Sequence, residues 1–247
     1  MPRIARSHDR AGGSPGGEGG ATTLLVSDLP DPTDGGTEQR LAAALRRCIA
    51  RWGLSKTTIE DLAREAGTSR ATVYRLCPGG KFQILELAVW SDVRELVDSV
   101  AATVGAADDL EDALTGALHD AMCFLDGHEA LRFVREHEPV VFEQFLDFER
   151  VEQVLHCAGD LLQPAFERFL EPADARATAI WLARLVLSYV QTPSPTLDLT
   201  DRAAAARLVR AFVLPGLRPL AERHRHAPTA DTAEGARHTD PTHPSQD

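Results

Sequence analysis

The side chains with the clearest capacity for chemistry lie together in residues 69–75, whose sequence is Ser-Arg-Ala-Thr-Val-Tyr-Arg. Arg70 and Arg75 carry guanidinium groups, which can bind guanine edges or phosphates through paired hydrogen bonds. Thr72 can bind a base edge or a phosphate, and its methyl group can meet a thymine methyl. The hydroxyl of Tyr74 can reach a phosphate. This combination suits the groove of a nucleic acid better than a protein core.

Two short helices and a turn, predicted over residues 57–81, position these side chains. Thr57 can cap the first helix, and Glu60 follows three residues later, as a capping box requires. Gly67 can end this helix in the left-handed conformation, and Ser69 can cap the next helix. The spacing predicts a helix-turn-helix, whose second helix can lie in the DNA major groove. An ordinary helical hairpin with solvated arginines is the alternative that the spacing leaves open.

Segment 37–85 resembles the DNA-binding domain of the TetR family of bacterial transcriptional regulators. The residues that carry the resemblance are Trp52-Gly53, Thr57 to Ala63, Ala66-Gly67, Ser69, Ala71 to Tyr74, and Lys81. The resemblance implies DNA contacts from Thr58, Ser69, Arg70, Thr72, Tyr74, Arg75 and Lys81. The sequence departs from the family pattern between Leu76 and Gly80, which lacks an aromatic pair and is one residue longer. The resemblance therefore gives the least information about where the following helix begins.

Charge is unevenly distributed along the chain. The net charge is −11, yet segment 37–83 holds nine Lys and Arg residues against four Asp and Glu residues. Phosphate binding needs a positive surface at the contact and does not need a positive protein. The distribution therefore fits one segment that binds double-stranded DNA on an otherwise acidic chain.

Composition and periodicity divide the chain into four segments. Residues 1–36 and 221–247 are polar and rich in Gly or Pro, which predicts disordered tails. Residues 37–83 form the predicted DNA-binding domain, with three helices. Residues 84–220 contain a series of amphipathic helices, which we assign to effector binding and dimerisation. Strand patterns are absent from the sequence, so the predicted fold class is all-α.

Two predicted helices near the C-terminus, at about 174–191 and 200–214, are apolar on more than one side. Such a helix must bury more than one face. We therefore expect a homodimer through these helices, with a deep core in a monomer as the alternative. The resemblance implies the same dimer. It also implies that a small molecule shifts the helix that begins near Phe82, and with it the DNA-binding domain.

The middle of the chain is rich in phenylalanine, which suits a hydrophobic pocket. We expect a small hydrophobic effector, and the first candidates to bind it are Phe124, Phe133, Phe145 and Trp181. Phenylalanine at helical spacing is also typical of a core. A DNA-binding protein without an effector is therefore the alternative function, and a middle section without a cavity would favour it.

The sequence supports no other chemistry. It contains no Gly-rich phosphate loop, HExxH or G-x-S-x-G motif, so we expect no enzyme activity and no cofactor. The four cysteines are widely spaced, which predicts buried free thiols and no metal site. The chain has no apolar run of about 18 residues and no apolar signal core at its N-terminus. We therefore expect a cytoplasmic protein without membrane contact.

Overall fold

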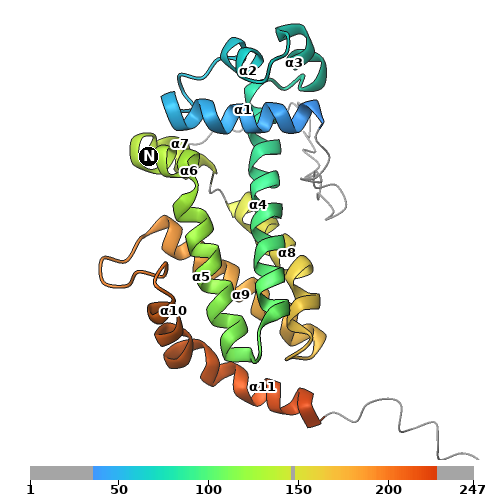
Figure 1. Cartoon of the computed structure of the whole chain (residues 1–247), viewed down its shortest axis with the longest axis vertical. Helices are drawn as coiled ribbons and strands as arrows, with labels where there is room; N and C mark the ends of the chain where they lie inside the picture. The colour runs from blue at the N-terminus through green and yellow to red at the C-terminus, as the bar shows by residue number, and fades with distance from the viewer. Residues whose placement is uncertain (1–35, 146–147, 227–247) are drawn as a thin grey trace, which may run out of the picture.

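The computed structural model describes residues 36–145 and 148–226, and the regular structure in these ranges is entirely helical (Figure 1). The prediction of an all-α fold is confirmed. Most of the two predicted tails, residues 1–35 and 227–247, lies outside the described ranges. In chain order the helices are α1 (Thr37–Trp52), α2 (Ile59–Glu65), α3 (Arg70–Leu76), α4 (Lys81–Ala106), α5 (Leu110–Gly127), α6 (Glu129–His137), α7 (Pro139–Phe145), α8 (Phe148–Phe166), α9 (Pro172–Gln191), α10 (Arg202–Leu208), the π-helix η2 (Val209–Val213) and α11 (Leu214–His226).

Helices α1, α2 and α3 form a three-helix unit at one end of the molecule, which we call the head (Figure 1). Its core contains Leu41 and Leu45 from α1, Leu62 from α2 and Val73 from α3. Each of these four side chains is 0 % exposed. Their spacing along each helix places them on one face, so the apolar pattern of the sequence accounts for the packing of the head.

The first turn of α2 differs by one residue from the sequence prediction. Thr58, and not Thr57, is the N-cap, and it forms the capping box with Asp61 in place of Glu60. Thr57 is buried, and its hydroxyl donates a 2.7 Å hydrogen bond to the carbonyl oxygen of Gly53. This contact with the end of α1 excludes Thr57 from the capping position.

The turn between α2 and α3 follows the prediction. Gly67 has φ +65°, a conformation that glycine adopts without the steric cost of a Cβ. The hydroxyl of Ser69 accepts a 3.1 Å hydrogen bond from the N–H of Thr72 and caps α3. The helix-turn-helix predicted from the spacing is therefore present.

Helix α4 connects the head to the larger helical unit below it, which we call the body (Figure 1). Its first residues pack in the head, with Ile84 and Leu85 in the same core as α1. Its second half packs in the body, with Val97 and Val104 in the second core. Because one continuous helix belongs to both cores, a displacement of its C-terminal half carries over to the head.

The body comprises α5 to α11 and the second half of α4, and its helix α6 packs against α1, with Ala130 in the core of the head. Helices α8 and α9 form its closest pair, and a Cβ on Gly159 would lie 2.7 Å from the side chain of Ile180. Leu114 and Leu118 of α5 and Phe166 of α8 are fully buried in its core. No helix in the described part of the chain is long and apolar enough to cross a membrane.

The C-terminal helices correct two expectations. The region expected as one helix at about 200–214 contains α10, η2 and the first residue of α11, and these three elements together run from Arg202 to His226. Residues 221–226, expected in a disordered tail, belong to α11. Contacts with the start of α9 explain the longer helix, because Arg223 lies 3.4 Å from Asp174 and His224 lies 2.9 Å from Glu171.

Candidate nucleic-acid interface and effector cavity

Helix α3 turns one face inward and the other to solvent. Val73 is fully buried, whereas Tyr74 on the opposite side is 50 % exposed. Arg70 and Arg75 are also exposed. Figure 1 shows α2 and α3 at the end of the molecule farthest from the body. The outer face of α3 therefore presents two guanidinium groups and a phenol where no other described helix covers them.

The contacts of Arg70 leave it available for exchange. Its guanidinium lies 3.7 Å from the carboxylate of Glu60, and both side chains are more than 60 % exposed. An ion pair with this exposure contributes little stability, because water screens it. A phosphate or a base could therefore replace Glu60 at small cost.

The hydroxyls of Thr58, Ser69 and Thr72, which are also predicted to contact DNA, already form hydrogen bonds at the first turns of α2 and α3. The Thr58 hydroxyl accepts from the N–H of Asp61 and donates to its carboxylate over 2.6 Å. The hydroxyls of Ser69 and Thr72 lie 2.9 Å apart. Thr58 and Ser69 are exposed and Thr72 is half-buried at this surface. Their DNA contacts stay predictions, but their part in forming α2 and α3 is visible in the hydrogen bonds.

Lys81 has a role that the sequence did not indicate. Its ammonium donates to the carbonyl oxygens of Leu54 and Thr57, over 2.7 and 3.0 Å. Both carbonyls belong to the loop between α1 and α2, so Lys81 joins the start of α4 to this loop. A phosphate contact by Lys81 stays a prediction, and any such contact would have to share the ammonium with these two carbonyls.

The same loop is attached to the body through Glu138, which lies between α6 and α7. Its carboxylate accepts hydrogen bonds from the backbone N–H groups of Leu54 and Ser55, over 2.7 and 2.9 Å. Gly53 makes this approach possible, because it has φ +85° and a Cβ would lie 2.9 Å from both Glu138 and Phe133. This contact between α6 and the head is the first of two polar attachments.

The pKa of Glu138 reflects these contacts. Burial favours the neutral acid, but the hydrogen bonds from Ser55 and Leu54 outweigh it and hold the pKa below its usual value. The ammonium of Lys81 acts in the same direction. Glu138 is therefore a carboxylate at neutral pH, and its charge is part of the attachment.

The second attachment joins three parts of the molecule. The carboxylate of Asp92 in α4 accepts from Arg46 in α1 and lies 2.9 Å from Nε2 of His128, between α5 and α6. Nδ1 of His128 accepts from the N–H of Leu131 over 3.1 Å, so Nε2 is the nitrogen that donates to Asp92. This chain of contacts, which we call the Asp92 bridge, ties the head to the body beside the end of α5.

A partly open cavity of about 290 Å³ lies next to the Asp92 bridge, mostly within the body but bordered by Ile49 and Leu54 of the head. Its wall is almost entirely apolar. The helices that line it are α1 and α4 to α9, with α4 contributing along its length from Leu85 to Val100. Arg46, Asp92 and His128 also belong to the wall. The space can hold a small apolar molecule in contact with the helix that carries the head.

The four candidate effector residues from the sequence have different positions. Phe124 lines the cavity. Phe133 does not line it, because its ring packs against Gly53 and stacks on His137 with ring centres 4.5 Å apart. Trp181 does not line it either, since it is 44 % exposed on the outside of α9. The side chain of Phe145 lies outside the described residues.

The sequence did not single out most of the residues that form the cavity. Helix α4 contributes the largest set, which includes Val89, Trp90, Val93, Leu96 and Val97. These positions have the spacing of an ordinary buried helix face, which gives no sign of whether the neighbouring space is filled. Only the packing of several helices shows which face borders a void.

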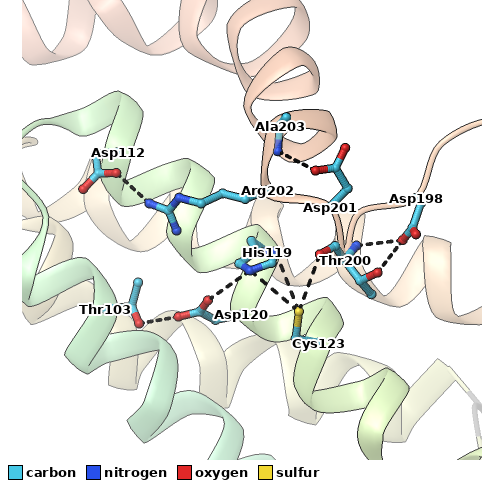
Figure 2. A network of polar contacts seen from close by, with 10 residues as sticks. All are labelled: Thr103, Asp112, His119, Asp120, Cys123, Asp198, Thr200, Asp201, Arg202 and Ala203. Carbon is cyan, nitrogen blue, oxygen red and sulfur yellow. Dashed lines mark hydrogen bonds and ion pairs between the residues drawn. The ribbon is translucent and has the colours of Figure 1, made fainter.

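A second group of polar side chains lies between α5 and the start of α10 (Figure 2). Arg202 pairs with Asp112 over 2.7 Å, and Cys123 lies 3.7 Å from His119 and 3.9 Å from the carbonyl of Thr200. Such a Cys–His pair suggests a nucleophile. Partial desolvation of this otherwise exposed residue, together with the neighbouring carboxylates, raises the pKa of the Cys123 thiol, however, so it stays protonated.

The four cysteines are all free thiols, as the spacing predicted. Cys48, Cys77 and Cys157 are buried, and burial raises the pKa of Cys157 to about 11. Cys123 corrects the expectation of burial, because it is exposed beside α10. The contacts in Figure 2 thus anchor α10 on α5 and provide no activated group.

Comparison with known proteins agrees with the architecture of the head. Residues 41–76 match the family model described as bacterial regulatory proteins, tetR family. The match covers most of α1 and all of α2 and α3. No curated protein matches the chain.

Solved structures with the same fold cover most of the chain. The TetR family repressor AlkX from Dietzia sp. strain DQ12-45-1b is 17 % identical, with a TM-score of 0.59 over 76 % of this chain and 98 % of that one. The regulator FadR from Bacillus halodurans is 20 % identical, with a TM-score of 0.50 over 72 % and 97 %. Head and body together thus have the fold of TetR-family regulators.

Proposed function

We propose that this chain, a member of the TetR family, is a homodimeric transcriptional repressor that binds a palindromic operator and is released by a small hydrophobic effector. One observation carries the proposal. The outer face of α3 is exposed, and the same chain places an apolar cavity against α4, the helix that holds the head. In this proposal the protein acts on DNA in the cytoplasm and catalyses no reaction.

The DNA-binding part of the proposal rests on the side chains of α3. Arg70 and Arg75 are placed to bind guanine edges or phosphates, and Tyr74 to reach a phosphate. One helix of seven residues reads few bases. Two heads on one dimer would read two half-sites, spaced by about one turn of DNA or a multiple of it.

The dimer part rests on apolar side chains that the described chain leaves uncovered. Trp181 in α9 is 44 % exposed and Phe212 in η2 is 80 % exposed. Helix α11, which continues η2, contacts the start of α9 through Arg223 and His224. A second copy of the same surface would cover both side chains in a twofold interface.

The effector part rests on how the cavity meets the head. A molecule in the cavity would contact α4 directly, and it would lie beside the Asp92 bridge. It could change the separation of two heads only by binding one arrangement of α4 more tightly than the other. A middle section without a cavity would have favoured the alternative, a DNA-binding protein without an effector, and the cavity argues against it.

The proposal is tested by selecting bound sequences from a random pool of duplexes and measuring their affinity by fluorescence polarisation. We expect a near-palindrome to bind far more tightly than random duplex at ordinary salt, and lipophilic molecules to release it. Equal affinity for random and selected duplexes would refute a sequence-specific regulator.

The oligomeric state needs a separate measurement. We expect the wild-type chain to sediment as a dimer, and the double variant Trp181→Ser with Phe212→Ser to sediment as a folded monomer. Loss of operator affinity should accompany the loss of the dimer, because each head alone binds weakly. A variant that remains a dimer would place the interface elsewhere.

A further inference from the structure

The wall of the cavity offers an incoming molecule almost no hydrogen-bonding groups. Polar atoms form a very small part of its surface, and side chains such as Val93, Leu96 and Leu118 form the rest. A charged or strongly polar group that enters such a space loses its water and finds few partners in return. The wall therefore selects for apolar ligands first.

Three polar groups at the wall, Arg46, Asp92 and His128, already bind one another. Asp92 accepts from Arg46 with one carboxylate oxygen and from His128 with the other. The remaining ring nitrogen of His128 accepts from the N–H of Leu131. A ligand carboxylate that approaches Arg46 would meet the negative charge of Asp92, which already accepts from that guanidinium.

The charges at the wall also cancel. The lining contains two arginines, Arg46 and Arg150, and two carboxylates, Glu86 and Asp92. Arg150 already interacts with another residue of the chain. An anion in this space would meet no excess positive charge, and it would lie close to the carboxylate of Asp92. A neutral molecule meets neither difficulty.

The dimensions of the cavity favour a chain-like shape. The lining residues of α4 run from Leu85 to Val100, which at 1.5 Å per residue is about 22 Å along the helix axis. The volume of about 290 Å³ lies near the lower end of the range of roughly 300–1,000 Å³ that is typical of small-molecule pockets. A small volume that borders so long a stretch of α4 suits an unbranched chain better than a compact ring system.

We infer that the effector of this protein is an uncharged, chain-like apolar molecule of medium length, and that the cavity rejects the carboxylate of the same chain. This inference rests on the proposed function, because it names the ligand class of the cavity assigned there. It predicts that the cavity binds neutral hydrocarbons and esters and rejects fatty acids. An apolar wall alone would not make this distinction.

The test compares two probes with the same chain, methyl decanoate and decanoate, at pH 8. Trp90 lines the cavity and is 7 % exposed, so its fluorescence reports occupancy in the full chain without DNA. We expect the ester to bind at least about tenfold more tightly than the carboxylate, because an unpaired buried charge costs more than a tenfold change in affinity. Equal or tighter binding of decanoate would overturn the inference, and so would failure of both probes to bind the folded chain.

A charge placed at the wall should change this preference. Gln153 in α8 lines the cavity, so Gln153→Lys should increase the affinity for decanoate by about tenfold and leave the ester nearly unchanged. Gln163→Lys on the same helix, outside the cavity lining, is the matched control and should change neither affinity. Similar changes in both variants would show that decanoate binds to the surface, which would contradict the assigned site.

Different results would refute the proposed function and the proposed ligand class. If the ester binds but no selected duplex does, the regulator is refuted and the ligand class stands. If selected DNA binds and decanoate releases it as effectively as the ester, the regulator stands and the ligand class is refuted.

Discussion

The head and the body are both built from packed helices but fill their interiors differently. In the head, side chains such as Leu41, Leu62 and Val73 are fully buried against one another. In the body, half-buried side chains such as Leu96 border a cavity of about 290 Å³. A filled interior resists deformation, whereas a void can be occupied and reshaped. The difference indicates that the head is packed to keep one shape, whereas the body can change shape when a molecule occupies the cavity.

The two units also differ in how they are joined. Helix α4 joins them covalently, and two polar attachments on the surface of the head add to it, one through Glu138 and one through Asp92. The second of these lies at the wall of the cavity. A ligand there would be able to disturb a polar contact with the head, although most of its own contacts would be apolar.

The largest effect should come from shortening a leucine in each unit. Leu62→Ala in the filled head should lower the free energy of unfolding by about 2–5 kcal/mol, because it creates a new void. Leu96→Ala at the cavity wall should cost less than about 2 kcal/mol, because that side chain is only half-buried. Urea unfolding followed by circular dichroism measures both. Equal losses would show that the two interiors do not differ in packing.

Removal of a guanidinium from α3 should affect DNA binding and leave folding intact. Arg70→Ala should weaken operator binding by about 1–3 kcal/mol per half-site. Its free energy of unfolding should be unchanged, since the contact with Glu60 is exposed. Polarisation with the selected operator measures the affinity. Arg202→Ala at the far end of the body is the matched control, and an equal loss of affinity there would contradict a specific role for α3.

Removal of the Glu138 carboxylate should loosen the attachment of the head. Glu138→Ala should lower the free energy of unfolding by about 1–2 kcal/mol, because the N–H groups of Leu54 and Ser55 lose their acceptor. Glu143→Ala, an exposed neighbour in α7, is the control and should have little effect. An unchanged stability in Glu138→Ala would show that water replaces the carboxylate without cost.

The same attachment should depend on pH in a defined direction. The folded protein lowers the pKa of Glu138 below the model-compound value of 4.5, so its contribution is fully present above that pH. The contribution is lost as the pH falls through the folded pKa. The difference in stability between wild type and Glu138→Gln should therefore be larger at pH 7 than at pH 3. A difference that grows on acidification would contradict the lowered pKa.

The smallest effect should come from Lys81. Lys81→Ala should lower the free energy of unfolding by about 1 kcal/mol, because the carbonyls of Leu54 and Thr57 lose a donor. The salt dependence of DNA binding shows whether the ammonium also meets a phosphate, since the slope would then fall by about one per contact. Lys56→Ala, an exposed neighbour in the same loop, is the control for stability. Equal free energies of unfolding for the two variants would contradict a structural role for Lys81.

The helix-turn-helix could be predicted closely because its signals are local. The cap of α3 at Ser69, the left-handed Gly67 and the alternation of buried Val73 with exposed Tyr74 each depend on residues within one or two turns. The error at the start of α2 shows the limit of such signals. Thr57 and Thr58 both fit a capping pattern, and a tertiary contact between Thr57 and Gly53 decided between them.

The effector candidates could not be predicted in the same way. Phe124 and Phe133 lie on similar apolar faces in the sequence, yet only Phe124 borders the cavity. Glu138 gave no signal, because its partners Leu54 and Ser55 lie more than eighty positions earlier in the chain. A contact over such a separation leaves no periodic pattern that a single sequence can reveal.

The sequence by itself determined the helical class, the helix-turn-helix and the basic, outward face of α3, since these depend on spacing, capping and charge within a few turns. The tertiary structure alone decided where the interior stays empty, which charges neutralise one another at its wall, and how Lys81, Glu138 and Asp92 fasten the head. The physical reason is that a void and a long-range polar contact are properties of several helices packed together, and no single helix encodes either.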